Sequence, residues 1–213
     1  MEGFTHISLL ENWSSLNNLK MSKTKILAAI QKNKPSGAPL PTIPSFTIGA
    51  ATPNDLFVAM VEVGGGQIIR DTDPQNLNTT IKKLFPEAKR IASPLPAVES
   101  NVDLDQILSP DELESVDIAV IRGQIGVAEN GAVWVTEEDC GHRVLPFITQ
   151  HLIILLKPSG IVHNMHEAYE RIQVDATGFG LFIAGPSKTA DIEQSLVIGA
   201  QGARSLTVVL GEV

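Results

Sequence analysis

Three short stretches of the sequence hold the residue types best suited to binding or acid–base chemistry. The first places Glu129 directly before Asn130 and Gly131. A carboxylate held on a rigid turn can orient a substrate hydroxyl or act as a general base. Asn-Gly between two β-type segments, 125–129 and 132–136, predicts a hairpin, because both turn positions need positive φ. The alternative role for Glu129 is the commoner one, that of an exposed turn residue.

The second stretch contains Arg143, which stands shortly before an apolar run. An arginine can clamp a carboxylate through two parallel hydrogen bonds. Its neighbour His142 titrates near neutral pH and so has the chemistry to accept the proton of a 2-hydroxy acid, although it ranks below Arg143 as a candidate. The alternative for both side chains is a surface ion pair.

The third stretch is a candidate ligand-binding loop that opens a predicted helix. Its candidate residues are Gly185, Ser187, Lys188, Thr189, Asp191 and Glu193. The pattern predicts a strand over 179–184, a helix over 190–198 and a parallel strand over 205–210. Such a loop would lie beyond the carboxyl end of a strand, where open α/β sheets bind ligands, and the helix N-terminus would attract an anion. Alternatively, the loop hydroxyls only cap the helix, and the two acidic residues disfavour a highly charged phosphate.

Alternating strands and helices must position these stretches. Apolar runs predict strands over 46–50, 67–70, 89–92, 116–121 and 151–156. Thr52-Pro53, Asp73-Pro74 and Asn164 have the chemistry of helix starts. This order is typical of an α/β fold with an open, mainly parallel sheet and helices on both of its faces.

The N-terminal part of the sequence differs from the rest. Residues 1–20 are polar and have no sustained period, so we expect a disordered extension or an incorrectly assigned start. Residues 21–44 predict a short helix with Ile26, Leu27 and Ile30 on one face, followed by a proline-rich linker. Residues 45–213 then form the α/β domain.

Composition limits the function further. With 16 basic and 24 acidic residues the net charge is −8, which argues against nucleic-acid binding. The single cysteine, Cys140, excludes an internal disulfide and a self-contained four-cysteine cluster, and it fits a cytoplasmic protein. We expect no membrane span, because the longest apolar run is far shorter than about 20 residues. The spacing of Cys140 and the nearby histidines predicts no metal site, and no dinucleotide or Walker-type motif occurs.

Three motifs together resemble one known family. They are Gly-Val-Ala-Glu-Asn-Gly-Ala at 126–132, Arg-Val-Leu-Pro at 143–146 and Gly-Pro-Ser-Lys-Thr-Ala-Asp-Ile-Glu at 185–193. Their order and spacing resemble the LUD domain of lactate-utilization protein C, over roughly residues 21–213. The resemblance implies a fold related to sugar-phosphate isomerases and CoA transferases. It also implies a role beside iron–sulfur partner proteins in the oxidation of L-lactate to pyruvate, with no cofactor of its own.

The sequence departs from that family pattern at three places. The acidic residue at position 129 is usually followed by Thr-Gly-Thr, whereas Asn130, Gly131 and Ala132 stand here. Lys188 replaces the usual arginine and keeps the charge without the planar fork, and Gln201 stands where a histidine is often found. These differences leave two alternatives open. One is a stand-alone enzyme or binding protein for a phosphate-bearing or carboxylate metabolite, and the other is a scaffold without a ligand.

Overall fold

The computed structural model describes residues 23–35, 37, 39, 41–42, 44, 52–70, 76–173, 178–192 and 195–211. The chain divides into two units, Met1–Ser45 and Phe46–Val213. In the first unit, residues 23–33 form the predicted helix, and all of their side chains are exposed. The predicted extension over 1–20 and the predicted strand over 46–50 lie outside the described residues.

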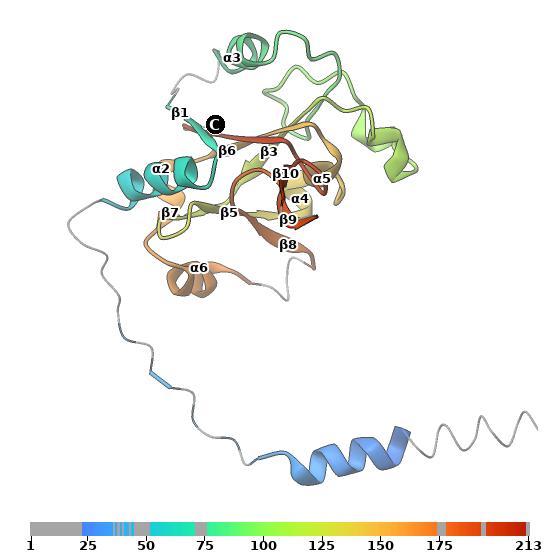
Figure 1. Ribbon diagram of the computed structural model, residues 1–213, viewed down its shortest axis with the longest axis vertical. Helices are drawn as coiled ribbons and strands as arrows, with labels where there is room; N and C mark the ends of the chain where they lie inside the picture. Colours follow the sequence, from blue (N-terminus) through green and yellow to red (C-terminus); the bar gives the residue numbers. More distant parts are fainter. Residues whose placement is uncertain are drawn as a thin grey trace, which may run out of the picture. The chain divides into compact units, whose positions relative to one another are not determined.

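The second unit is built on a five-stranded sheet with the order β1-β11-β6-β3-β2 (Figure 1). Every neighbouring pair in it is parallel, which confirms the predicted parallel sheet. The three central strands are aligned residue for residue, so their carboxyl ends meet at one edge. The strands are β1 (Gln67–Ile69), β2 (Ile91–Ala92), β3 (Ile118–Gly123), β6 (His151–Leu156) and β11 (Ser205–Leu210).

A second, smaller sheet of four strands has the order β7-β4-β5-β8. It comprises β4 (Ile125–Val127), β5 (Ala132–Thr136), β7 (Ile161–Val162) and β8 (Gly180–Ile183). Strands β4 and β5 form the antiparallel hairpin predicted from Asn-Gly. The connecting loop is longer than predicted, because β4 already ends at Val127. The next two residues turn toward β7, where the N–H of Ala128 donates to the carbonyl of Val162 at 2.8 Å.

Three apolar clusters show how the layers pack. The largest lies between the two sheets and includes side chains from α2 (Pro53–Val63), α4 (Glu137–Cys140) and α5 (Leu145–Ile148). The opposite face of the five-stranded sheet is covered by α3 (Leu77–Leu84). Helix α6 (Met165–Arg171) covers the outer face of the smaller sheet, as Figure 1 shows. Helices therefore lie on both faces of the parallel sheet, as predicted, and the smaller sheet forms an additional layer on one of them.

Local sequence signals fix the ends of two helices. The Thr52 hydroxyl accepts the N–H of Asp55 at the start of α2, Pro53 follows at the first helical position, and Gly64 ends the helix. The Asn164 side chain caps α6 by accepting the N–H of Glu167. The predicted cap of α3 at Asp73-Pro74 lies outside the described residues. Short 3-10 turns complete the chain at Leu104–Gln106 (η2), Pro110–Leu113 (η3) and Pro158–Gly160 (η4).

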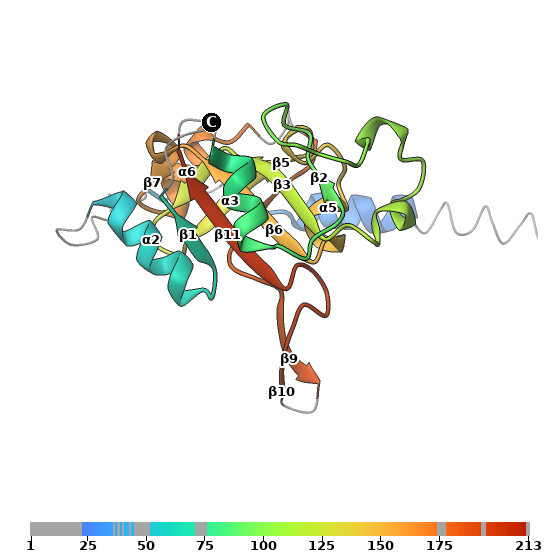
Figure 2. The same ribbon diagram turned by 90° about the horizontal axis from the view of Figure 1, so that it is seen from above.

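The C-terminal segment contradicts the sequence prediction. Residues 190–192 and 195–198 lie in strands instead of the predicted helix: β9 (Lys188–Ile192) and β10 (Ser195–Ile198) pair as an antiparallel hairpin. Figure 2 shows this hairpin extending away from the two sheets. The predicted βαβ unit is also wrong, because β8 and β11 belong to different sheets. The four-residue spacing of Ile192 and Leu196 fits a helix face, but β-branched residues such as Thr189 and Val197 also favour strands, and here the strand preference prevails.

Candidate functional site

Glu129, the predicted catalytic carboxylate, lies half-buried against the start of α6. Its Oε1 accepts the backbone N–H of Met165 at 2.8 Å, and its own N–H donates to the carbonyl of His163 at 3.0 Å. Met165 is the first residue of α6, where the backbone N–H groups have no partner within the helix. Glu129 therefore acts as a cap contributed by a neighbouring loop, which is a structural role that the sequence spacing did not reveal.

The turn after Glu129 is fixed by packing against α2. The Asn130 side chain accepts the N–H of Ala132 at 2.9 Å, and Gly131 adopts a φ of +69°. A Cβ atom on Gly131 would lie 2.7 Å from the backbone nitrogen of Val61. Glycine is thus required at position 131 for two reasons: φ is positive, and the α2 backbone leaves no room for a Cβ atom.

The loop at 185–188 meets the same helix at its C-terminal end. The Lys188 ammonium donates to the carbonyl of Gly64, and Gly185 packs directly on Gly64 with a φ of +77°. Two of the predicted sites, the turn at Gly131 and the loop carrying Lys188, therefore lie along the last two turns of α2.

One side of this loop lines a pocket of about 290 Å³, here called the loop pocket. Its polar side chains are Ser187, Lys188 and Gln201, and its walls are mainly apolar, with Phe147 and Leu181 among them. The Ser187 N–H donates to the carbonyl of Ala203 at 2.9 Å, which joins the loop to the segment before β11. A small apolar pocket with a few convergent polar groups is the usual form of a metabolite site.

The loop pocket lies elsewhere than predicted. It includes Leu152 and Leu206, the second residues of β6 and β11, so it lies beside the amino ends of the parallel strands. Since no helix starts at residue 190, the predicted helix N-terminus is absent and contributes nothing to anion binding. Thr189 and Asp191 belong to β9, and Glu193 lies outside the described residues.

Arg143 forms an ion pair of its own. Its guanidinium donates two hydrogen bonds to Glu137, Nε to Oε1 at 2.6 Å and Nη2 to Oε2 at 2.8 Å. The guanidinium carbon also lies 5.4 Å from the centre of the Phe179 ring. The hydrogen bonds from Arg143 lower the pKa of Glu137 below its usual value. This exposed pair matches the surface role that was the alternative for Arg143, and its bidentate geometry is the one predicted for a substrate carboxylate.

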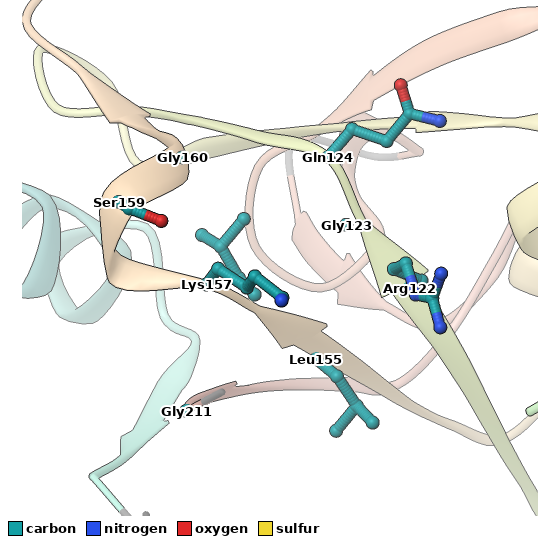
Figure 3. Close-up of a pocket in the computed structure, with 9 residues that line it drawn as sticks. Arg122, Gly123, Gln124, Leu155, Lys157, Ser159, Gly160 and Gly211 are labelled. Atoms are coloured by element: carbon teal, nitrogen blue, oxygen red, sulfur yellow. The ribbon is translucent and has the colours of Figure 1, made fainter. Parts of the chain in front are cut away.

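A second cleft, missed by the sequence reasoning, opens at the carboxyl ends of β3, β6 and β11 (Figure 3). This strand-end cleft has a volume of about 380 Å³. In Figure 3, the Lys157 and Ser159 side chains extend from the end of β6 toward the side where β3 carries Arg122. None of the described residues that line it is acidic, although the chain has a net charge of −8. The lining consists of Arg122, Gly123, Gln124, Leu155, Leu156, Lys157, Ser159, Gly160 and Gly211.

Tight backbone packing shapes this cleft. A Cβ atom on Gly160 would lie 2.8 Å from the carbonyl oxygen of Gln124, so the turn after β6 touches the chain between β3 and β4. The Gln124 side chain donates to the buried carboxylate of Asp139 at 2.7 Å, and the same oxygen accepts the Thr136 hydroxyl at 2.6 Å. This network, anchored on the buried Thr136 and Asp139, holds the segment that follows Arg122 in place.

A weak signal for the strand-end cleft is present in the sequence. Arg122 and Lys157 each stand at the end of a strongly apolar strand, followed by glycine or by Pro-Ser-Gly. Each directly follows a predicted strand, at 116–121 or 151–156, and neither is among the predicted site residues. Their proximity follows from the pairing of Arg122 with Leu155 across β3 and β6, which the sequence alone did not provide.

Two further features bear on redox and membrane chemistry. The Cys140 thiol is buried, and desolvation together with the nearby carboxylate of Asp139 raises its pKa to about 12. It is therefore an inert thiol at neutral pH. Within the described part of the chain, no three metal-ligating side chains gather, and no helix has the length and apolarity needed to cross a bilayer.

Comparison with known proteins agrees with this fold. The chain is similar to lactate utilization protein C of Shouchella clausii, with 31% identity over 113 residues that cover 50% of this chain and 49% of the relative. It is also similar to lactate utilization protein C of Geobacillus kaustophilus, with 28% identity over segments covering 65% of this chain and 60% of the relative. The matched region thus spans only about half to three-fifths of these relatives.

A solved structure and a family model agree with these relatives. The crystal structure of a DUF162 family protein from Deinococcus radiodurans matches with a TM-score of 0.57 and 18% identity, covering 75% of this chain and 96% of that one. At that identity the match supports the fold alone. The family model for the LUD domain matches residues 103–210, just over half of the sequence. This chain therefore belongs to the LUD-domain family.

Proposed function

We propose that this protein acts in lactate utilization and binds a small carboxylate in the loop pocket, without a redox centre of its own. The observation that carries the proposal is that the first four residues of the most specific family motif, Gly-Pro-Ser-Lys at 185–188, line that pocket. The relatives named lactate utilization protein C supply the metabolic context. The expected reaction is the oxidation of L-lactate to pyruvate beside iron–sulfur partner proteins.

The pocket chemistry fits a three-carbon acid. At about 290 Å³ it lies just below the range of drug-sized ligand sites, roughly 300–1,000 Å³, as expected for a smaller ligand. The Lys188 ammonium has three donors, so it can bind a carboxylate while it keeps its hydrogen bond to Gly64. The Ser187 hydroxyl and the Gln201 amide can bind the 2-hydroxyl or 2-oxo oxygen, and apolar walls such as Leu181 suit the methyl group.

The protein needs partners if electrons are to leave the substrate. Its single cysteine is buried with a pKa of about 12, so the chain supplies no reactive thiol for electron transfer. We therefore expect the protein to co-purify with cysteine-rich iron–sulfur proteins from lactate-grown cells. Their absence from such a preparation would count against the partnership, while leaving ligand binding by the isolated chain open to separate measurement.

Calorimetric titration of the isolated protein with L-lactate and with pyruvate tests the binding itself. Replacing Lys188 by Met should weaken the binding about tenfold or more, because a charge-assisted hydrogen bond is lost. Lys188→Arg should preserve it, since the resemblance implies an arginine at this position. Equal affinity of the wild type and the Lys188→Met variant would exclude the loop pocket as the carboxylate site.

A further inference from the structure

We propose that the strand-end cleft is a second ligand site, which binds the phosphate group of a small phosphate-bearing metabolite. It shares no lining residue with the loop pocket, so it does not depend on the function proposed above. The two sites lie near opposite ends of β6. Leu152 lines the loop pocket, whereas Leu155 and Leu156 line the strand-end cleft.

The position of the cleft is the first argument. Ligands of open α/β sheets bind beyond the carboxyl ends of the strands. Strands β3 and β6 end at Gly123 and Leu156, which are paired neighbours, and Gly211 follows the last residue of β11. All three residues line the cleft.

The charge of the cleft is the second argument. Arg122 and Lys157 both contribute to a lining in which the described residues include no carboxylate, in a chain with 24 acidic and 16 basic residues. The Arg122 side chain is exposed and has no hydrogen-bond or ion-pair partner in the described part of the chain. A guanidinium fork and an ammonium together match the charge of a phosphate monoester, which is between about −1.5 and −2 at pH 7.

The hydroxyl of Ser159 is the third argument. The Ser159 side chain extends toward the same space as the Lys157 ammonium (Figure 3) and offers a hydroxyl to a phosphate oxygen. The η4 turn that carries Ser159 is closed by a hydrogen bond from the Gly160 N–H to the Lys157 carbonyl at 2.9 Å. Two cationic side chains and a hydroxyl in one cleft suit the charge and the three terminal oxygens of a phosphate better than a singly charged carboxylate.

Calorimetric titration with inorganic phosphate and with glycerol phosphate, at an ionic strength held constant with sodium chloride, tests this site. Both probes should bind the wild type more tightly than acetate does. Arg122→Gln and Lys157→Gln should each weaken phosphate binding about tenfold or more. Arg143→Gln is the matched control, because it removes the same charge from an arginine outside the cleft, and it should leave the affinity unchanged.

Three results would overturn the proposal. They are equal phosphate affinity of the wild type and Arg122→Gln, an equal loss in the Arg143→Gln control, or acetate binding as tight as phosphate binding. If Arg122→Gln does not fold, Arg122→Lys replaces it in the test. This variant keeps the positive charge and loses the planar guanidinium, so phosphate affinity should fall while the protein stays folded. Phosphate binding that depends on Lys188 and not on Arg122 would place the anion in the loop pocket and reject the second site.

Discussion

The carboxylate of Glu129 accepts the backbone N–H of Met165 at 2.8 Å, so a hairpin loop of the smaller sheet caps helix α6. Replacing Glu129 by Ala removes this acceptor from a half-buried N–H group. We expect a loss of about 1 kcal/mol in the free energy of unfolding, measured by urea denaturation. Glu129→Gln should lose less, because its amide oxygen can still accept the bond. An Ala variant as stable as the wild type would show that the cap contributes nothing.

Gly131 should be far less tolerant of substitution than another glycine with nearly the same φ. Gly131 and Gly178 have φ values of +69° and +67°, but only at Gly131 would a Cβ atom meet backbone, 2.7 Å from the nitrogen of Val61. Gly178→Ala should cost about 1 kcal/mol through backbone strain alone. Gly131→Ala should cost roughly 2–4 kcal/mol, because α2 has to move. Equal losses in thermal or urea unfolding would contradict the packing described here.

The ion pair of Arg143 and Glu137 should appear in the titration of that carboxylate. Hydrogen bonds from Arg143 lower the pKa of Glu137, so the pair stabilises the fold above the ordinary pKa of glutamate. That contribution is lost as the pH falls through the lowered pKa. In Arg143→Gln, the Glu137 pKa followed by NMR should rise toward its ordinary value. An unchanged pKa would mean that the pair does not form in solution.

The Cys140 thiol should resist modification in the native protein. Burial raises its pKa to about 12, so almost no thiolate exists at pH 8. Labelling with a thiol-reactive disulfide reagent should be slow in buffer and fast in denaturant. Rapid labelling of the folded protein would show that the environment of Cys140 opens readily.

Local signals made much of the fold predictable from the sequence. Thr52-Pro53 starts α2 and Asn164 caps α6 as predicted, and Asn-Gly at 130–131 forms the predicted hairpin. These features depend on backbone preferences within a few residues. The segment 190–198 was misassigned because its short apolar pattern fits both a helix and a strand.

The candidate sites were less predictable, because they depend on contacts between distant segments. The sequence shows no hydrogen-bond partner for the Glu129 carboxylate. Its partner, the backbone N–H of Met165, is 36 residues away and reaches Glu129 because β4 and β7 pair. Arg122 and Lys157 line the same cleft because β3 and β6 are neighbours in the strand order β11-β6-β3. Hydrophobic periodicity predicts that these strands exist, but it does not give their order in the sheet.

Growth on L-lactate tests the central claim most directly. The gene would be deleted in the strain of origin and restored as the wild type, as Lys188→Met or as Glu129→Gln. We predict that deletion abolishes growth on L-lactate, and that the wild type and Glu129→Gln restore it whereas a folded Lys188→Met does not. Unimpaired growth of the deletion strain, with no second copy of the gene present, would contradict a role in lactate utilization.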